Sequence, residues 1–237
     1  MFRGPIVAFR LVPRSCECWL LLADLARLKL CPRMTNAAKS PFEIYSDADI
    51  VDQIREFPRA WLCAVGGDPL QSTLLPLLPE TDSQGRLSTL LGHLPRRNPL
   101  FQALTSDARA CVLFTGPQAY VSPACVSDPA WAPTWNFAQV RIEATVRFNE
   151  NGIDEALHAL TDAMEVREPT GWTPEAMGAR YSTLSRAVVA FRAEVNRHQA
   201  RFKLGQDEKP ERLREILERH SDPTLVRWMR RFNAGRC

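Results

Sequence analysis

The chain has 237 residues, of which 45% are hydrophobic and 24% are charged, a balance that is ordinary for a folded globular protein. Its net charge of +3 is too small an excess to indicate nucleic-acid binding by itself. The seven cysteines exclude a paired zinc motif, because no second pair follows Cys16 and Cys18. Cys63 and Cys111 lie in apolar, strand-like runs that predict buried free thiols, so we expect a reducing, cytoplasmic compartment and no membrane partner.

Residues 1–40 differ in composition from the rest of the chain, because they are rich in arginine and poor in acidic residues. Their apolar run at 19–22 is too short to span a bilayer. Three interpretations are open, which are a disordered extension, an organelle-targeting segment, and an upstream start with Met34 as the working first residue. We expect the folded domain at 41–208 and a helical tail at 209–237.

The first predicted elements are a helix and three strands. Ser46 lies three residues before Asp49, a helix-start signal, and Pro58 ends the helical spacing. A buried strand at 60–65, a Gly66-Gly67 turn and a returning strand at 70–78 then predict a hairpin. The remaining early elements are expected at 86–92 (strand) and 99–104 (helix).

The second half of the chain alternates strands and helices. A strand at 110–115, a turn at Gly116-Pro117 and a run back over 119–122 predict a tight hairpin. Apolar and polar residues alternate strictly over 140–148, which predicts a half-buried strand. The later expected elements are helices at 153–164 and 174–184, a strand at 187–195, and tail helices at 209–219 and 223–232. Six or seven antiparallel strands with inserted helices indicate an α+β barrel.

The most informative segment is the basic turn at 92–99. His93, Arg96 and Arg97 arrive together, and Asn98 and Pro99 are a good N-cap and first helical residue. Guanidinium groups, free backbone N–H groups and a helix N-terminus together suit a phosphate. The residues alone leave a solvated basic turn equally open.

Conventional catalytic apparatus is absent from the sequence, which has no nucleophile elbow, P-loop or zinc-protease motif. Three other segments carry side chains that suit a flat anionic ligand. Tyr120 and Ser122 share one face of a predicted strand, Trp135 lies where a loop enters the long strand, and Lys203 offers a second cation. Each of these is open to a structural interpretation as well.

Four motifs in fixed order carry a family resemblance. They are GHLPRRNPLF at 92–101, FTGPQAYVSP at 114–123, PTWNF at 133–137 and RFKLGQD at 201–207. In this order they resemble the PaiB-type FMN-binding negative transcriptional regulators, a branch of the pyridoxamine-phosphate-oxidase-like split barrels. The similarity spans roughly 41–232.

The resemblance implies an antiparallel split β-barrel with peripheral helices that forms a homodimer and holds FMN at the dimer interface. The cofactor-binding residues that it implies are His93, Arg96, Asn98, Tyr120, Ser122, Trp135, Lys203 and Gln206. The first three match the motif near the flavin phosphate, and the next three would lie beside the isoalloxazine ring or in the interface. The last two would close the site, and which subunit supplies them is open.

The motif residues His93, Arg96 and Asn98 of the phosphate turn are kept, whereas most departures from the family pattern lie around the ring. The departures are Pro95, Phe101, the run 124–126, Gly205 and Asp207. An FMN-binding regulator is therefore one hypothesis, although no helix-turn-helix is evident and the tail arginines alternate with acidic residues. A flavin-dependent oxidoreductase acting on a small molecule is the alternative, and a haem-binding relative with His93 as ligand is a third.

Overall fold

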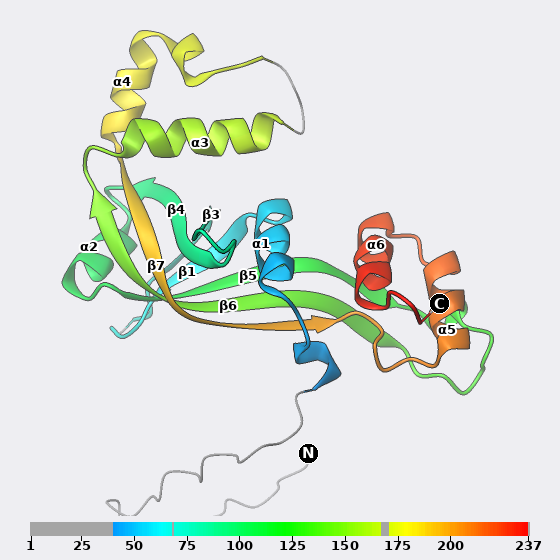
Figure 1. Ribbon diagram of the computed structural model, residues 1–237. Helices are drawn as coiled ribbons and strands as arrows, with labels where there is room; N and C mark the ends of the chain where they lie inside the picture. Colours follow the sequence, from blue (N-terminus) through cyan, green and yellow to red (C-terminus); the bar gives the residue numbers. More distant parts are fainter. Residues whose placement is uncertain (1–39, 68, 167–170, 237) are drawn as a thin grey trace, which may run out of the picture. The chain divides into compact units, whose positions relative to one another are not determined.

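The computed structural model describes residues 40–67, 69–166 and 171–236, so the predicted extension at 1–40 lies almost wholly outside it. The described chain forms a seven-stranded antiparallel sheet and six α-helices (Figure 1). The strands are β1 (Arg59–Ala64), β2 (Ser72–Pro76), β3 (Leu78–Thr81), β4 (Leu87–Pro95), β5 (Arg109–Val121), β6 (Thr134–Asn149) and β7 (Val188–Lys203). The α-helices are α1 (Asp47–Glu56), α2 (Pro99–Ser106), α3 (Ile153–Glu165), α4 (Ala179–Arg186), α5 (Pro210–Arg219) and α6 (Pro223–Phe232). Three short 3-10 helices are η2 (Pro41–Glu43), η3 (Pro123–Cys125) and η4 (Pro174–Met177).

The strand order closes the sheet on itself. The order is β2-β1-β5-β6-β7-β4-β3, so β2 and β3 are the two edges. Only Leu77 separates these edge strands in the chain. The two steps from Pro76 to Leu78 span at most about 7 Å, so the end of one edge strand meets the start of the other and the sheet must curl into a barrel. The predicted α+β antiparallel split barrel is therefore confirmed, whereas the homodimer stays a prediction.

The single strand predicted at 70–78 is divided at this closure. Leu77 has no exposed surface, and its N–H donates to the carbonyl of Pro58 at 2.9 Å rather than to a partner strand. Pro76 ends the pairing of β2, because proline has no N–H for the ladder. Leu78 then pairs with Leu91 on β4, at the other edge.

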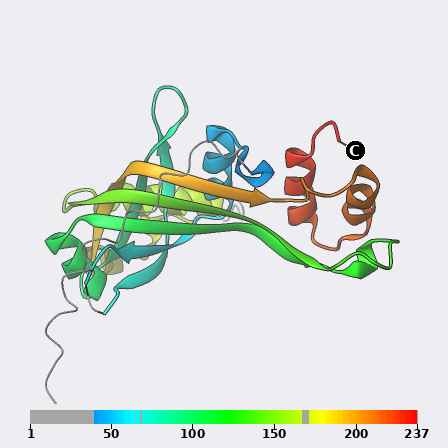
Figure 2. The same ribbon diagram turned by 90° about the horizontal axis from the view of Figure 1, so that it is seen from below.

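Strands β5, β6 and β7 form a long antiparallel ladder that runs from the barrel to α5 and α6 (Figures 1 and 2). The tight hairpin predicted at Gly116-Pro117 is wrong, because β5 continues through it to Val121. The register instead shifts between Thr115 and Gln118, which makes an irregularity of the β-bulge kind. A Cβ at Gly116 would lie 2.8 Å from Cδ of the buried Gln53, so glycine lets β5 pass close to α1.

Two other elements have boundaries that differ from the predicted ones. The helix predicted at 174–184 divides into η4 and α4 at Gly178, whose φ is +54°. The strand predicted at 187–195 continues to Lys203 as β7. Asn196 and Arg197 are both exposed, so the apolar alternation that marks a strand is interrupted there.

The tail helices belong to the same hydrophobic core as the barrel. Trp228 on α6 is 1% exposed, and Phe202 of β7 stacks on Phe232 with ring centroids 4.5 Å apart. Arg227 of α6 pairs with Glu56 of α1, and Arg231 of α6 pairs with Asp49 and Asp52 of α1. The predicted capping box of α1 is present, since Ser46 and Asp49 exchange hydrogen bonds. Among the described residues, no helix is long and apolar enough to cross a membrane.

Candidate functional site

The basic turn lies where β4 ends and α2 begins, as the sequence predicts. Asn98 is the N-cap of α2, and its side-chain oxygen accepts the N–H of Leu100 at 3.0 Å. Its amide nitrogen donates to Oγ1 of Thr73 on β2 at 2.8 Å. Asn98 therefore shapes the turn and fastens it to the barrel, and both halves of its side chain are engaged.

The backbone amides that were expected to be free are mostly occupied. The N–H of Arg96 donates to the carbonyl of Ala187 at 3.0 Å, and that of Asn98 donates to Pro95 at 2.9 Å. The N–H of Phe101 donates to the carbonyl of Asn98 at 2.9 Å, and Pro99 has none. The turn closes its own hydrogen bonds, so an anion there must be held chiefly by side chains.

The two arginines of the turn differ in what they contact. The guanidinium of Arg96 donates to both oxygens of Glu150, at 3.1 and 2.5 Å, and to the carbonyl of Arg186 at 3.2 Å. These hydrogen bonds lower the pKa of the Glu150 carboxyl. Arg97 is exposed and makes no ion pair within the described part of the chain. Arg97 is thus available to a ligand at once, whereas Arg96 must first leave Glu150.

His93 lies on β4, three residues before Arg96, and borders a cavity of about 700 Å³. Helices α3 and α4 supply much of its wall, including the side chains of Leu157, Tyr181 and Leu184. Nδ1 of His93 is buried and has no hydrogen-bond partner among the described residues. Burial also lowers the pKa of the imidazole, so near neutral pH His93 is uncharged and offers one unsatisfied nitrogen.

The second group of predicted residues lies at the far end of the β5–β6–β7 ladder. Tyr120 and Trp135 are paired across β5 and β6, with ring centroids 6.1 Å apart. The two side chains are 49% and 51% exposed, so together they form an open aromatic surface. Lys203 donates from Nζ to Oγ1 of Thr134 and, at 3.2 Å, to the carbonyl of Trp135.

The side chains of Ser122 and Gln206 form hydrogen bonds with the backbone beside the aromatic surface of Tyr120 and Trp135. Ser122 caps η3 by accepting the N–H of Ala124 at 3.2 Å. Gln206 accepts the N–H of Leu204 at 2.7 Å and donates to the carbonyl of Phe202 at 2.6 Å. Both side chains satisfy local backbone groups, and their contact with the cofactor stays a prediction.

His220 is a neighbour of this surface that the sequence did not nominate. Its Nδ1 accepts the N–H of Asp222 at 3.1 Å, which leaves the proton on Nε2 for the 3.2 Å contact with the carbonyl of Tyr120. The sequence likewise did not indicate Glu150 or the residues of α3 and α4 that line the cavity beside His93. These residues come from distant parts of the chain, and no local spacing points to them.

The two groups lie far apart within one chain. His93 pairs with Ala190 near the start of β7, and Lys203 is the last residue of that strand. The thirteen intervening steps give a path of about 40 Å along β7, which bends on the way (Figure 1). FMN is much shorter than this path, which argues against contact of both groups of one chain with the same cofactor.

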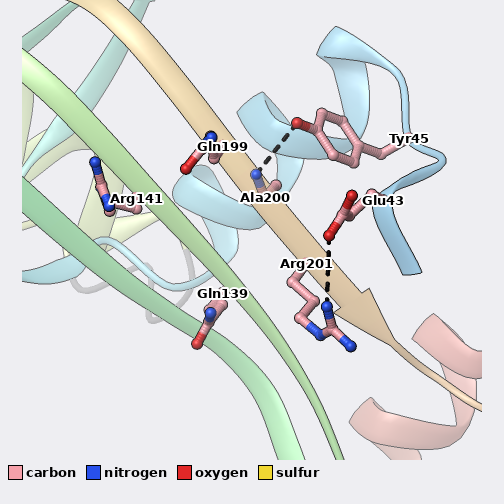
Figure 3. Close-up of a pocket in the computed structure, with 7 residues that line it drawn as sticks. All are labelled: Glu43, Tyr45, Gln139, Arg141, Gln199, Ala200 and Arg201. Carbon is pink, nitrogen blue, oxygen red and sulfur yellow. Dashed lines mark hydrogen bonds and ion pairs between the residues drawn. The ribbon is translucent and has the colours of Figure 1, made fainter. Parts of the chain in front are cut away.

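A polar hollow of about 420 Å³ lies between the two groups, on β6 and β7 beside η2 (Figure 3). Arg201 pairs with Glu43 at 3.4 Å, and the hydroxyl of Tyr45 accepts the N–H of Ala200 at 3.2 Å. Arg141 is likewise paired, with Glu143. Because its charges are satisfied internally, this hollow offers little to an anionic cofactor.

Comparison with known proteins identifies the domain. Residues 38–197 match the model of a family described as "Putative FMN-binding domain". The chain is 28% identical over 134 residues to protease synthase and sporulation protein PAI 2 of Bacillus subtilis, a match to 54% of this chain and 63% of that protein. It is 30% identical over 89 residues to an uncharacterized protein of Saccharomyces cerevisiae, a match to 35% of this chain and 53% of that protein. In both relatives the match therefore spans less than two thirds of their length.

Among solved structures, the FAD and haem binding protein of Mycobacterium smegmatis aligns with a TM-score of 0.49 at 16% identity. That alignment covers 67% of this chain and 71% of the other.

Proposed function

The chain belongs to the FMN-binding domain family, and from that membership we propose that two copies of it hold FMN in two equivalent composite sites. In each site, the turn at 93–98 of one subunit binds the phosphate. The surface formed by Tyr120 and Trp135 of the other subunit faces the ring, with Lys203 beside it. The observation that carries this proposal is the path of about 40 Å along β7 between the two groups in one chain.

The residues of the turn fit the phosphate end of FMN. The buried, unpartnered Nδ1 of His93 needs a hydrogen-bond partner, and the unpaired Arg97 supplies a forked donor at the same turn. Arg96 adds a second guanidinium when it exchanges Glu150 for the ligand. Asn98 positions the turn through its bonds to Leu100 and Thr73.

A two-fold axis near the middle of β7 would bring the two groups together. The midpoint between Ala190 and Lys203 falls between residues 196 and 197, and rotation about it exchanges the two ends of the strand. An exposed apolar row crosses the outer face close to this point. The row consists of the cross-strand neighbours Leu74, Trp61 and Leu113, which are 38%, 48% and 41% exposed. Leu113 in turn pairs with Arg141 of β6, which pairs with Gln199 of β7. An apolar row of this kind favours association with a second copy.

An oxidoreductase role is favoured over DNA binding by the tail. Bound FMN supplies reversible electron transfer, and the open Tyr120–Trp135 surface leaves room for a small molecule to meet the ring. Four tail arginines pair with carboxylates of the same chain, and they are Arg212, Arg219, Arg227 and Arg231. Those guanidinium groups already have carboxylate partners, which reduces the tail charge that is available to DNA phosphates. Three free thiols in the described chain agree with a cytoplasmic location.

Mixed dimers test the composite site. One variant carries Arg96→Ala and Arg97→Ala, and the other carries Tyr120→Ala and Trp135→Ala, all at exposed or half-exposed positions. Each homodimer should bind FMN weakly. When the two are co-expressed in equal amounts, half of the dimers are mixed and each regains one intact site, so about one quarter of all sites should fill. Sites confined to one chain would give no recovery, and that result would refute the composite arrangement.

The absorbance spectrum and reduction kinetics test the chemistry. The purified protein should show flavin bands, whereas a Soret band would instead support haem bound at His93. Mixing with reduced nicotinamide or a candidate substrate should bleach the flavin, and oxygen should restore it. An FMN-loaded protein that resists reduction and binds its own upstream DNA in a salt-dependent manner would favour the regulator.

A further inference from the structure

Two thiols lie directly opposite each other on neighbouring strands of the barrel. Cys63 on β1 is the register partner of Cys111 on β5. Both are free and half-buried, not buried as their apolar surroundings in the sequence suggest. Their strand neighbours Leu62 and Val112 have no exposed surface, so both thiols stand on the opposite, outer face of the sheet.

The hydrogen-bond pattern sets the distance between their backbones. The N–H of Val65 donates to the carbonyl of Arg109 at 3.0 Å, and these residues are in register two positions from the thiols. Cross-strand pairs alternate, so Cys63 and Cys111 also form a hydrogen-bonded pair, with Cα atoms about 5.5 Å apart. This separation is within the most common range for a disulfide. The Cβ atoms of such a pair are about 5.5 Å apart, whereas those of a disulfide are about 4 Å apart, so a bridge would draw the two strands slightly together.

A hollow beside Cys111 leaves this thiol open to a small reagent. Its volume is about 350 Å³, and the residues around it include Arg109, Arg141 and Glu143. Each guanidinium also has a carboxylate neighbour, Asp107 for Arg109 and Glu143 for Arg141. Burial raises the pKa of both thiols, and at Cys111 the charge of Arg141 lowers the pKa while that of Glu143 raises it. Cys111 borders the hollow and Cys63 does not, so a reagent in the hollow reaches Cys111 first.

We propose that Cys63 and Cys111 are a reversible disulfide pair, closed by exchange with a small disulfide such as glutathione disulfide. The thiolate of Cys111 attacks one sulfur of the reagent, and the other half leaves as a thiolate. The thiolate of Cys63 then attacks the sulfur of Cys111 and releases the second half. The protein dithiol is oxidised, the reagent is reduced to two thiols, and those thiols take up the two protons. This pair goes beyond FMN binding. Trp61 and Leu113 flank it on the same face, so the exchange requires that the second copy leave the hollow beside Cys111 open.

Peptide mapping of the assembled, FMN-loaded protein tests the pair directly. Incubation with glutathione disulfide should lower the mass by about 2 Da for this bridge and join tryptic peptides 60–86 and 110–141. A dithiol reductant should separate them again. Peptide 110–141 also contains the buried Cys125, so Cys125→Ser is the matched control and should retain the link. Cys63→Ser and Cys111→Ser should each abolish it.

Other outcomes overturn the pair. These are stable glutathione adducts with no ring closure, thiols that do not react in the assembled protein, and a link that joins two chains or survives Cys111→Ser.

Discussion

The Arg96–Glu150 ion pair gives a sharp prediction about the phosphate site, because it competes with the proposed ligand. Glu150 occupies two donor positions of the Arg96 guanidinium, at 3.1 and 2.5 Å. If Arg96 binds the FMN phosphate, it must first give up this partner. Replacing Glu150 with glutamine weakens the competition and should therefore tighten FMN binding.

The exposure of the pair sets the size of the effect. The two side chains are 36% and 60% exposed, so water screens the attraction and the pair is weak. The dissociation constant for FMN should fall by about two- to fivefold in Glu150→Gln. Arg96→Ala removes a charge-assisted contact to phosphate, so it should raise that constant by about tenfold or more.

Quenching of flavin fluorescence measures both constants. Riboflavin lacks the phosphate, so its affinity should change in neither variant. Asp82→Asn is the control variant, because it removes the same charge from another exposed ion pair, with Arg86, outside both groups of site residues. If Glu150→Gln instead weakens FMN binding, Glu150 holds Arg96 in place as a structural element, and the phosphate contact falls to Arg97.

Three further predictions concern stability. Gly92→Ala should destabilise the protein by about 1–3 kcal/mol in urea unfolding, since its Cβ would lie 2.4 Å from Leu77 and 2.9 Å from Phe191; the cost should shrink in a Leu77→Ala background, and full additivity would contradict the clash. The hydrogen bond to Glu175, together with that to the Asp154 carbonyl, raises the pKa of His158, so its stabilisation is complete below the unfolded pKa and is lost as pH rises through the folded one. The difference in urea midpoint between wild type and His158→Gln should therefore shrink from about pH 6 to about pH 8.5, and a difference that grows would reverse the sign. Closing the proposed disulfide constrains a loop of about 50 residues, so the oxidised protein should be more stable by up to about 4 kcal/mol, and a lower melting temperature on oxidation would indicate strain.

Local features of this protein follow from its residues in order. The capping box of α1, the N-cap and first-turn proline of α2, and the alternation along β6 each depend on neighbours a few positions apart. The four ordered motifs likewise identify the family, because a motif is a local pattern. These signals are sufficient for the antiparallel barrel and for the place of the basic turn.

The arrangement of the site depends on pairing between distant strands, which no local pattern records. Strand register places His93 of β4 beside the start of β7, whereas Lys203 is the last residue of β7. It also places Cys63 opposite Cys111. The fold also brings Glu150 into contact with Arg96. At Gly116, where the sequence predicts a hairpin turn, β5 instead has an irregularity that packs against α1. Residue spacing tells which face of a strand a side chain occupies, but only the closed sheet decides what stands beside that face.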